Sequence, residues 1–293
     1  MLAECTRTQT RQEREQRILA CAARLPAPPD VVMALINASG EESSGADLIA
    51  RLVERDPALT TRVLKVANSS FYAMTGRIGT VRDAVVILGF GTVCNIVVAF
   101  EITHRYAASP GSRALMRGFW RHAMLSAVCS AALARASDAD SGIAFTGGLL
   151  HDIGRLVLVS AFPEEFSEIT TTPGSEGMQA EDWKDMLDLE RRQFGMNHAQ
   201  IGGWLCEHWR FPGELSGALR AHHDPAATNP LAQLIGHADL IAHALNGENA
   251  PARALQAAAN ALTGLAARES APELLDRIEQ QARAAEQLIA GGA

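Results

Sequence analysis

The sequence predicts an all-α fold, and three observations carry that prediction. Alanine is abundant and aromatic residues make up only 5% of the chain, which favours helices because strands are enriched in aromatic and β-branched side chains. Apolar residues recur at helical spacing along most of the chain. No segment shows a convincing strand pattern or an internal repeat. The hydrophobic share, 47% of 293 residues, is enough for a sizeable buried core.

The first half of the chain predicts a series of short helices separated by proline and glycine. A polar start becomes helical over 18–24, and the proline-rich stretch 25–29 then interrupts it. Further helices are expected from Asp30, from Ala46, from Asp56-Pro57, over 81–88 and over 93–103, with loops at 41–45 and 76–80 and a break at 89–91. The best domain boundary is 109–112, where serine, proline and glycine follow one another.

The second half predicts longer helices. They are expected over 114–136, 181–194, 199–209, 213–221, 230–245 and an alanine-rich region at roughly 252–290. An apolar segment over 143–161 contains the polar pair His151-Asp152, and a loop is expected at 170–177. The predicted organisation therefore has four parts: a polar N-terminal segment (1–24), a helical N-terminal lobe (25–110), a second helical lobe (111–245) and a C-terminal helical extension (246–293).

Charge and cysteine content narrow the class of protein. A net charge of −7, from 33 acidic and 26 basic residues, argues against a dedicated nucleic-acid binder, which needs a basic surface. The five cysteines form no C-x-x-C pair and are expected to be reduced thiols. The longest uncharged run, 84–100, is short for a membrane span and contains glycine, threonine and asparagine. We therefore expect a cytoplasmic protein with no membrane and no nucleic-acid partner.

The adjacent pair His151-Asp152 is the strongest chemical signal. Apolar residues and glycines flank it in the stretch 147–154. Burying a carboxylate there is costly unless another group offsets its charge, and a divalent metal does so. Imidazole and carboxylate ligands suit Zn, Fe, Mn or Ni. The alternative is an aspartate that caps a helix beside a tethering histidine.

Two further polar residues lie on separate apolar helices. His122 is in the middle of the helix over 114–136, and Asp239 is in the helix over 230–245. With His151 and Asp152 they would complete a four-ligand metal site. The alternative for His122 is an ordinary histidine at the edge of the core.

Three histidines offer ligands for a second ion, namely His198, His222 and His223. The alternative for the His222-His223 pair is a cation favoured by the C-terminus of the preceding helix. His243 lies one helical turn after Asp239 and is expected to be solvated rather than to support a ligand.

The order of these residues resembles a known superfamily. His122, His151-Asp152 and Asp239 are similar to the H…HD…D signature of HD-superfamily metal-dependent phosphohydrolases, and His198 with His222-His223 resembles the binuclear pattern of HD-GYP cyclic-di-GMP phosphodiesterases. Several separated motifs resemble the narrower HDOD (HD-related output domain) family, over about 25–245. They are DPALTTRVLKVANS at 56–69, Phe71-Tyr72, GLLHDIG at 148–154, W-x-F-P at 209–212 and H-H-x-P at 222–225.

The resemblance implies a helical HD-like domain preceded by a helical N-terminal lobe, acting in bacterial signal transduction. It favours a non-enzymatic regulatory module that contacts an unidentified signalling protein and carries one or two divalent ions (Fe, Mn, Zn or Ni). The alternative is a metal-dependent phosphohydrolase or phosphodiesterase acting on a nucleotide or phosphate ester, with Arg155 contacting phosphate and Arg192 or Arg220 assisting. A purely structural scaffold is the third and weakest hypothesis, because it treats all matched positions as coincidence.

Two departures from the HD-GYP pattern bear on catalysis. Arg155 stands where that pattern has lysine, and the Gly-Tyr-Pro loop expected after the paired histidines is replaced by HDPAATNP at 223–230. We therefore expect no strong hydrolysis of cyclic-di-GMP.

Overall fold

The computed structural model describes residues 10–38, 45–68, 78–106, 113–170, 182–246, 250–267 and 269–290. All regular structure in these residues is helical, with no strand, so the predicted all-α class is confirmed. The helices are α1 (Arg11–Ala22), α2 (Asp30–Ala38), α3 (Gly45–Val53), α4 (Pro57–Ala67), α5 (Val81–Leu88), α6 (Phe90–Tyr106), α7 (Arg113–Ala136), α8 (Ser141–Leu150), α9 (Ile153–Ala161), α10 (Pro163–Thr170), α11 (Asp182–Phe194), α12 (His198–His208), α13 (Gly213–Ala221), α14 (Pro230–Asn246), α15 (Ala250–Gly264) and α16 (Ala271–Ala290).

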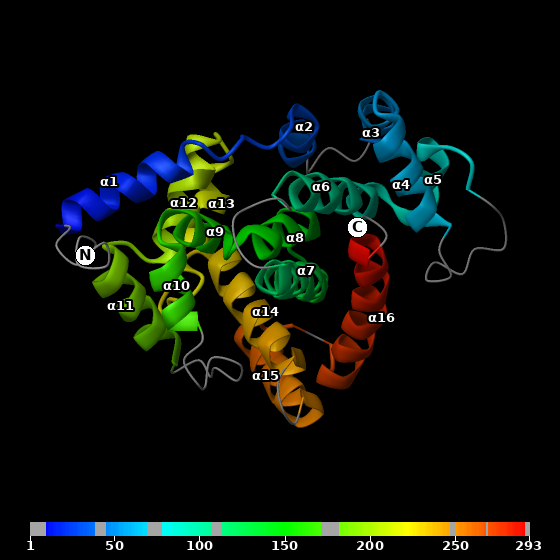
Figure 1. Cartoon of the computed structure of the whole chain (residues 1–293). Helices are drawn as coiled ribbons and strands as arrows, with labels where there is room; N and C mark the ends of the chain where they lie inside the picture. Colours follow the sequence, from blue (N-terminus) through cyan, green and yellow to red (C-terminus); the bar gives the residue numbers. More distant parts are fainter. Residues whose placement is uncertain are drawn as a thin grey trace.

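Two apolar clusters form the interior. The smaller one is built by α3, α4 and α5 with Leu35 of α2 and one end of α6, and includes Ile49, Val63 and Val97. The larger one is built by α1 and α7 to α16, and it also takes in Val32 of α2 and, from the other end of α6, Val98 and Ile102. Helix α6 therefore belongs to both clusters, and in Figure 1 it runs between the α3–α5 group and the helices α7 and α8.

Helix α1 starts earlier than the sequence pattern predicts. Thr10 and Glu13 form a capping box, in which the Thr10 hydroxyl accepts from the Glu13 N–H and the Glu13 carboxylate accepts from the Thr10 N–H, and this begins the helix at Arg11. Ile18 and Ala22 are fully buried in the larger cluster, where α1 packs on α9 and α12. Amphipathic residues of the N-terminal segment thus become part of the larger apolar cluster.

The apolar segment expected over 143–161 is two helices, because the chain turns at His151-Asp152 between α8 and α9. Glycine permits α8 to approach α7 closely: a Cβ on Gly148 would lie 2.6 Å from the Ser126 carbonyl oxygen and 2.8 Å from the Ala127 Cα. The stretch Ser141–Ala161 is long and apolar enough to cross a membrane, but 83% of it is buried inside the molecule. Core packing accounts for its composition.

Other expected boundaries shift by a few residues. Helix α6 begins at Phe90, so Gly89, with φ of 85°, is the whole break before it. The helix α10 was not predicted, and the alanine-rich C-terminal region divides at Ala266, whose φ is 51°. The expected loops at 41–45 and 170–177 and the boundary at 109–112 fall almost entirely outside the described residues.

The C-terminal helices cover the second lobe. Helix α15 packs on α14, and α16 packs along α7. Arg277 of α16 donates to both carboxylate oxygens of Glu269 at 2.6 Å and to the Ala132 carbonyl of α7 at 3.1 Å. These helices therefore support α7 and α14, which carry His122 and Asp239.

Candidate metal centre

The structure brings all seven predicted ligand residues together from five places in the chain. Helix α7 supplies one, the α8–α9 junction two, the first residue of α12 one, the end of α13 two, and α14 one. In that order they are His122, His151 and Asp152, His198, His222 and His223, and Asp239. All of them are buried or nearly so, and the two aspartate residues are each at most 2% exposed as whole residues.

The first group of donors surrounds Asp239. His122 Nε2 lies 2.9 Å from Asp239 Oδ1, and His151 Nε2 lies 3.4 Å from the same oxygen. The two imidazole nitrogens are themselves 3.3 Å apart. Two rings and one carboxylate thus converge on a small volume.

The second group surrounds Asp152. His198 Nε2 lies 3.1 Å from Asp152 Oδ1 and 3.0 Å from His223 Nε2. His222 completes this group, whose potential ligand atoms all lie within 4.8 Å of one another. Asp152 also connects the two groups, since His151 Nε2 lies 3.7 Å from its other oxygen.

Backbone and carboxylate acceptors orient three of the rings. Nδ1 of His151 bonds the Gly148 carbonyl and Nδ1 of His222 bonds the Leu219 carbonyl, each at 2.7 Å. A carbonyl only accepts, so Nδ1 carries the hydrogen, and the Nε2 of a neutral ring is left with a lone pair. His198 Nδ1 is held in the same way by Glu190 Oε2 at 2.7 Å. This is the arrangement that metal-binding histidines use.

Neither simpler explanation of the sequence signals holds. Asp152 occupies the N-cap position of α9, but its side chain makes no capping hydrogen bond. His222 ends α13, yet burial, reinforced by His151 and His198, lowers its pKa to about 3, so the ring is neutral rather than a cation at a helix C-terminus. Both residues direct their polar atoms into the cluster instead.

The electrostatics concentrate negative charge at the centre. Burial alone would raise the pKa of Asp152, but Arg155, His151 and His198 hold that pKa well below its usual range. Burial likewise opposes ionisation of Asp239, while His243, His122 and His151 keep its pKa low. Burial also lowers the pKa of His151, but the two carboxylates outweigh it and raise the value to about 9. In the absence of another cation, His151 therefore holds a proton.

This donor set fits one or two divalent ions. The Nε2 atoms of neighbouring rings lie 3.0 to 3.3 Å apart, an arrangement that is unfavourable unless a proton or a cation lies between them. Nε2 of His222 is buried and has no hydrogen-bond partner among the described residues. A metal would satisfy these nitrogens and replace the proton on His151.

Two residues lie at the centre that the sequence pattern does not place there. Glu190, on the polar helix α11, is 1% exposed and was not singled out, because only folding brings α11 beside the start of α12. His243 is not solvated as expected: its side chain is 19% exposed, and Nε2 lies 3.5 Å from Asp239 Oδ1. The spacing of four residues from Asp239 was the signal available for it.

The three arginines proposed to contact phosphate differ in their distance from the metal centre. Arg155 Nη1 lies 3.2 Å from Asp152 Oδ2, with a side chain 22% exposed. Arg192 is exposed, and Arg220 is exposed and pairs with Glu207. Arg155 is therefore the one of the three that reaches the centre.

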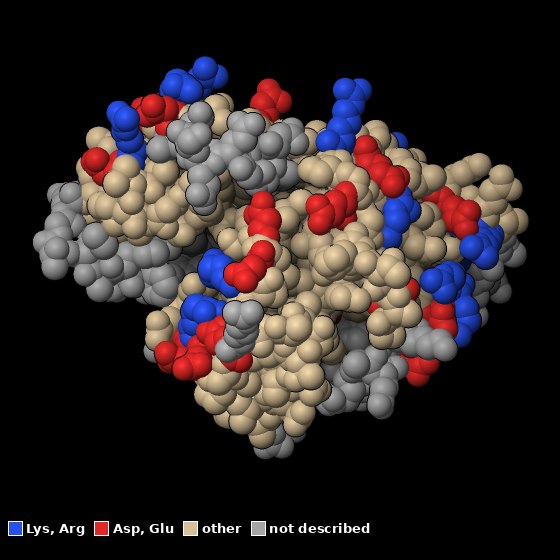
Figure 2. Space-filling view, turned by 180° about the vertical axis from the view of Figure 1, so that it is seen from behind, with Lys and Arg blue, Asp and Glu red and all other residues tan. Residues whose placement is uncertain are grey.

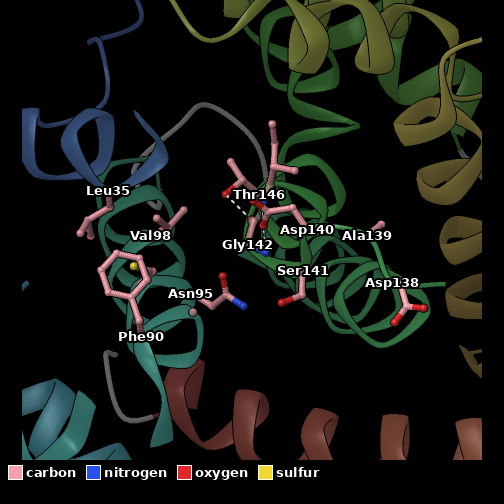
Figure 3. A pocket seen from close by; sticks show the side chains of 13 residues that line it. Leu35, Phe90, Asn95, Val98, Asp138, Ala139, Asp140, Ser141, Gly142 and Thr146 are labelled. Carbon is pink, nitrogen blue, oxygen red and sulfur yellow. Dashed lines mark hydrogen bonds between the residues drawn. The ribbon is translucent and has the colours of Figure 1, made fainter. Parts of the chain in front are cut away.

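A separate cavity of about 530 Å³ lies between α2, α6 and the start of α8 (Figure 3). Leu35, Phe90 and Val98 give it an apolar wall, and Asn95 faces Ser141 across it. Asp140 at its edge accepts from two backbone N–H groups and caps α8. Helix α8 thus runs from this contact between the lobes to His151, and the cavity is distinct from the metal centre.

Comparison with known proteins gives the family and the fold. The family model for the HDOD domain matches residues 25–225. The chain belongs to the HDOD family. This HDOD protein is 27% identical over 209 residues to an uncharacterised protein of Treponema pallidum (strain Nichols), covering 69% of the chain but only 39% of that relative.

Solved structures share the fold of this HDOD protein. A candidate phosphohydrolase from Shewanella amazonensis SB2B is 24% identical with a TM-score of 0.70, over 93% of this chain and 98% of the other. A candidate signal transduction protein from Marinobacter aquaeolei VT8 is 22% identical with a TM-score of 0.66, over 97% of this chain and 66% of the other. At these identities the likeness shows the common helical fold.

Proposed function

We propose that this HDOD protein is a signal-transduction module built around a divalent metal centre. The observation that carries the proposal is the buried cluster of five histidines and two aspartates, in which Nδ1 of His151, His198 and His222 is held by an acceptor. The two groups of donors suit one or two ions of Fe, Mn, Zn or Ni. In this proposal the metal stabilises the second lobe and determines the conformation that a partner protein recognises.

The output is proposed to be contact with a signalling protein in the cytoplasm rather than with a nucleic acid or a membrane. The net charge of −7 supports this. On the face in Figure 2, acidic and basic side chains are interspersed, and the described residues form no continuous basic area there. The name of the Marinobacter neighbour is in line with a role in signalling.

Metal analysis of the purified protein tests the proposal. The protein is prepared without added ions, its metal content is measured by mass spectrometry, and its melting temperature is compared with and without a chelator. We expect one or two ions per chain and a lower melting temperature after chelation, because a ligand that binds only the folded state stabilises it. Absence of bound metal together with unchanged melting would overturn the metal centre.

A second candidate function is phosphoester hydrolysis, which the position of Arg155 favours. Its guanidinium lies at the centre beside Asp152, where it would hold phosphate oxygens in bidentate fashion. A bound ion at such a site would activate water and polarise the phosphoryl group. Among the solved structures of this fold, the Shewanella protein is named as a candidate phosphohydrolase.

Turnover assays distinguish the two functions. Bis(p-nitrophenyl) phosphate and cyclic-di-GMP are offered with Mn²⁺ to the wild type, Arg155→Met and Asp152→Asn. Hydrolysis that both substitutions abolish would establish the enzyme. We expect no strong turnover of cyclic-di-GMP, because the chain lacks the Gly-Tyr-Pro loop after His223.

A further inference from the structure

We propose that His243 is a metal ligand, and that with His122 and Asp239 it forms a three-donor subsite distinct from the group around Asp152. This inference rests on the proposed metal centre. It assigns a ligand outside the H…HD…D pattern and states which donors share an ion.

Helix geometry places His243 at this position. Asp239 and His243 are four residues apart on α14, so their side chains project from the same face, one turn apart. The His243 ring centroid lies 4.3 Å from that of His122, and one ligand atom from each of His122, Asp239 and His243 lies within 4.8 Å of the others. At 19% exposure the side chain of His243 points towards the centre rather than into solvent.

Hydrogen bonding alone does not account for this convergence. Three imidazole nitrogens approach the single oxygen Oδ1 of Asp239: His122 at 2.9 Å, His151 at 3.4 Å and His243 at 3.5 Å. One carboxylate oxygen offers two lone pairs, so it cannot accept a full hydrogen bond from all three. An ion that takes both nitrogen and oxygen donors resolves this arrangement.

Burial divides the donors into an outer and an inner group. The side chains of His122 and His243 are 14% and 19% exposed, whereas His198 and Asp152 are 0% and 3% exposed. The inner group offers four protein donors: Asp152, His198, His222 and His223. His151 is assigned to neither group, because its Nε2 lies between them, 3.4 Å from Asp239 Oδ1 and 3.7 Å from Asp152 Oδ2. Fewer protein donors and greater exposure leave more coordination positions to water. The ion at His122, Asp239 and His243 is therefore the more exchangeable of the two.

Two substitutions at His243 separate a ligand from a hydrogen-bond donor. His243→Gln keeps an N–H that can face Asp239 but removes the imidazole ligand. His243→Asp keeps a ligand oxygen but removes the donor. His237→Gln is the control, because His237 is a half-buried histidine on the same helix that faces Gly264 of α15.

The measurement is Mn²⁺ binding, followed by the electron paramagnetic resonance signal of the free ion and by metal content after dialysis. We expect the wild type and His237→Gln to bind two ions, His243→Gln to bind the weaker ion at least tenfold less tightly, and His243→Asp to retain it. Melting in chelator is recorded for each variant, so that loss of the fold is recognised separately.

Two results would overturn the inference and leave the metal centre in place. Unchanged Mn²⁺ binding by His243→Gln, with loss in Asp239→Asn, would show that the metal centre exists without His243. If His243→Gln retained the weaker Mn²⁺ ion and His243→Asp lost it, His243 would be a hydrogen-bond donor to Asp239 and not a ligand. If the wild type itself binds no ion, the proposed function falls and this inference falls with it.

Discussion

Glu190 accepts two hydrogen bonds from His198 through the same oxygen, Oε2: one from the backbone N–H at 2.8 Å and one from Nδ1 at 2.7 Å. Glu190 is 1% exposed and lies on α11, whereas His198 is the first residue of α12. The carboxylate therefore satisfies an N–H at the start of α12 and fixes the ring with Nε2 towards Asp152. Acidic partners of this kind increase the basicity of a ligand histidine.

Glu190→Gln is accordingly expected to weaken metal binding about 10- to 100-fold, the usual range for a residue that orients a ligand. The amide keeps the size of the side chain but loses the charge that faces His198. Glu207→Gln is the matched control, since Glu207 is exposed on α12 and pairs with Arg220. Titration with Zn²⁺ measures both variants, and equal affinity for Glu190→Gln and wild type would contradict the role.

Asp152→Asn and Asp239→Asn are expected to lose bound metal and the stability that the metal supplies. Each substitution keeps the shape and removes a charge that the cations need. If the site is filled at about one hundred times its dissociation constant, the loss is about 2.7 kcal/mol of unfolding free energy. Metal content and urea unfolding with and without chelator check this. A loss of about 1 kcal/mol that is the same in chelator would indicate only a missing hydrogen bond.

Gly154→Ala is expected to destabilise the protein by about 1–3 kcal/mol through overpacking. A Cβ there would collide with the His198 carbonyl oxygen and lie 2.8 Å from its carbon, both in the backbone, so α9 and α12 would have to separate. Metal affinity should fall as well, because His198 moves. Gly118→Ala is the control: no atom of the described residues lies within 4 Å of its added Cβ, so the helix should gain about 0.5–1 kcal/mol. Thermal unfolding gives both values, and a neutral Gly154→Ala would refute the close crossing.

The metal-free protein is expected to be most stable near pH 6.5. Burial lowers the pKa of His222 to about 3 and that of His243 to about 4. Below pH 6.5 these two histidines become protonated in the unfolded chain but stay neutral in the folded chain. The free energy of unfolding therefore falls as the pH drops towards 4. The pKa of His151 is raised to about 9, so its contribution is complete below pH 6.5 and is lost as the pH rises to 9.

Urea unfolding in chelator at pH 4.5, 6.5 and 9 tests this dependence. His222→Gln should make the loss of stability on the acid side smaller, because glutamine does not titrate while His243 still does, and it should leave the alkaline side as it is. A stability that rises steadily from pH 6.5 to 4.5 would contradict neutral burial of these histidines.

Local patterns account for what could be read from the chain before folding. The 3.6-residue periodicity and the glycine and proline breaks predicted the helices, because helical hydrogen bonds and the apolar face depend on near neighbours. The HD pair, the paired histidines and Asp239 were recognisable because they occur together in the order of a known superfamily, whereas the local context of each one alone left a structural alternative open. The break between α8 and α9 was missed, since the apolar run continues across it.

Contacts between distant segments decided the remainder. The way the helices cross places α1 on α9 and α12 and brings Glu190 of α11 to His198. It also turns His243 towards His122 instead of solvent. Such crossings depend on side-chain packing across residues far apart in the chain, where Gly148 and Gly154 permit close approach. The amino-acid sequence determines which types of donor are present. The packed helices determine which nitrogen faces which oxygen. Burial removes the water that would otherwise hydrogen-bond to each group, so the groups depend on one another.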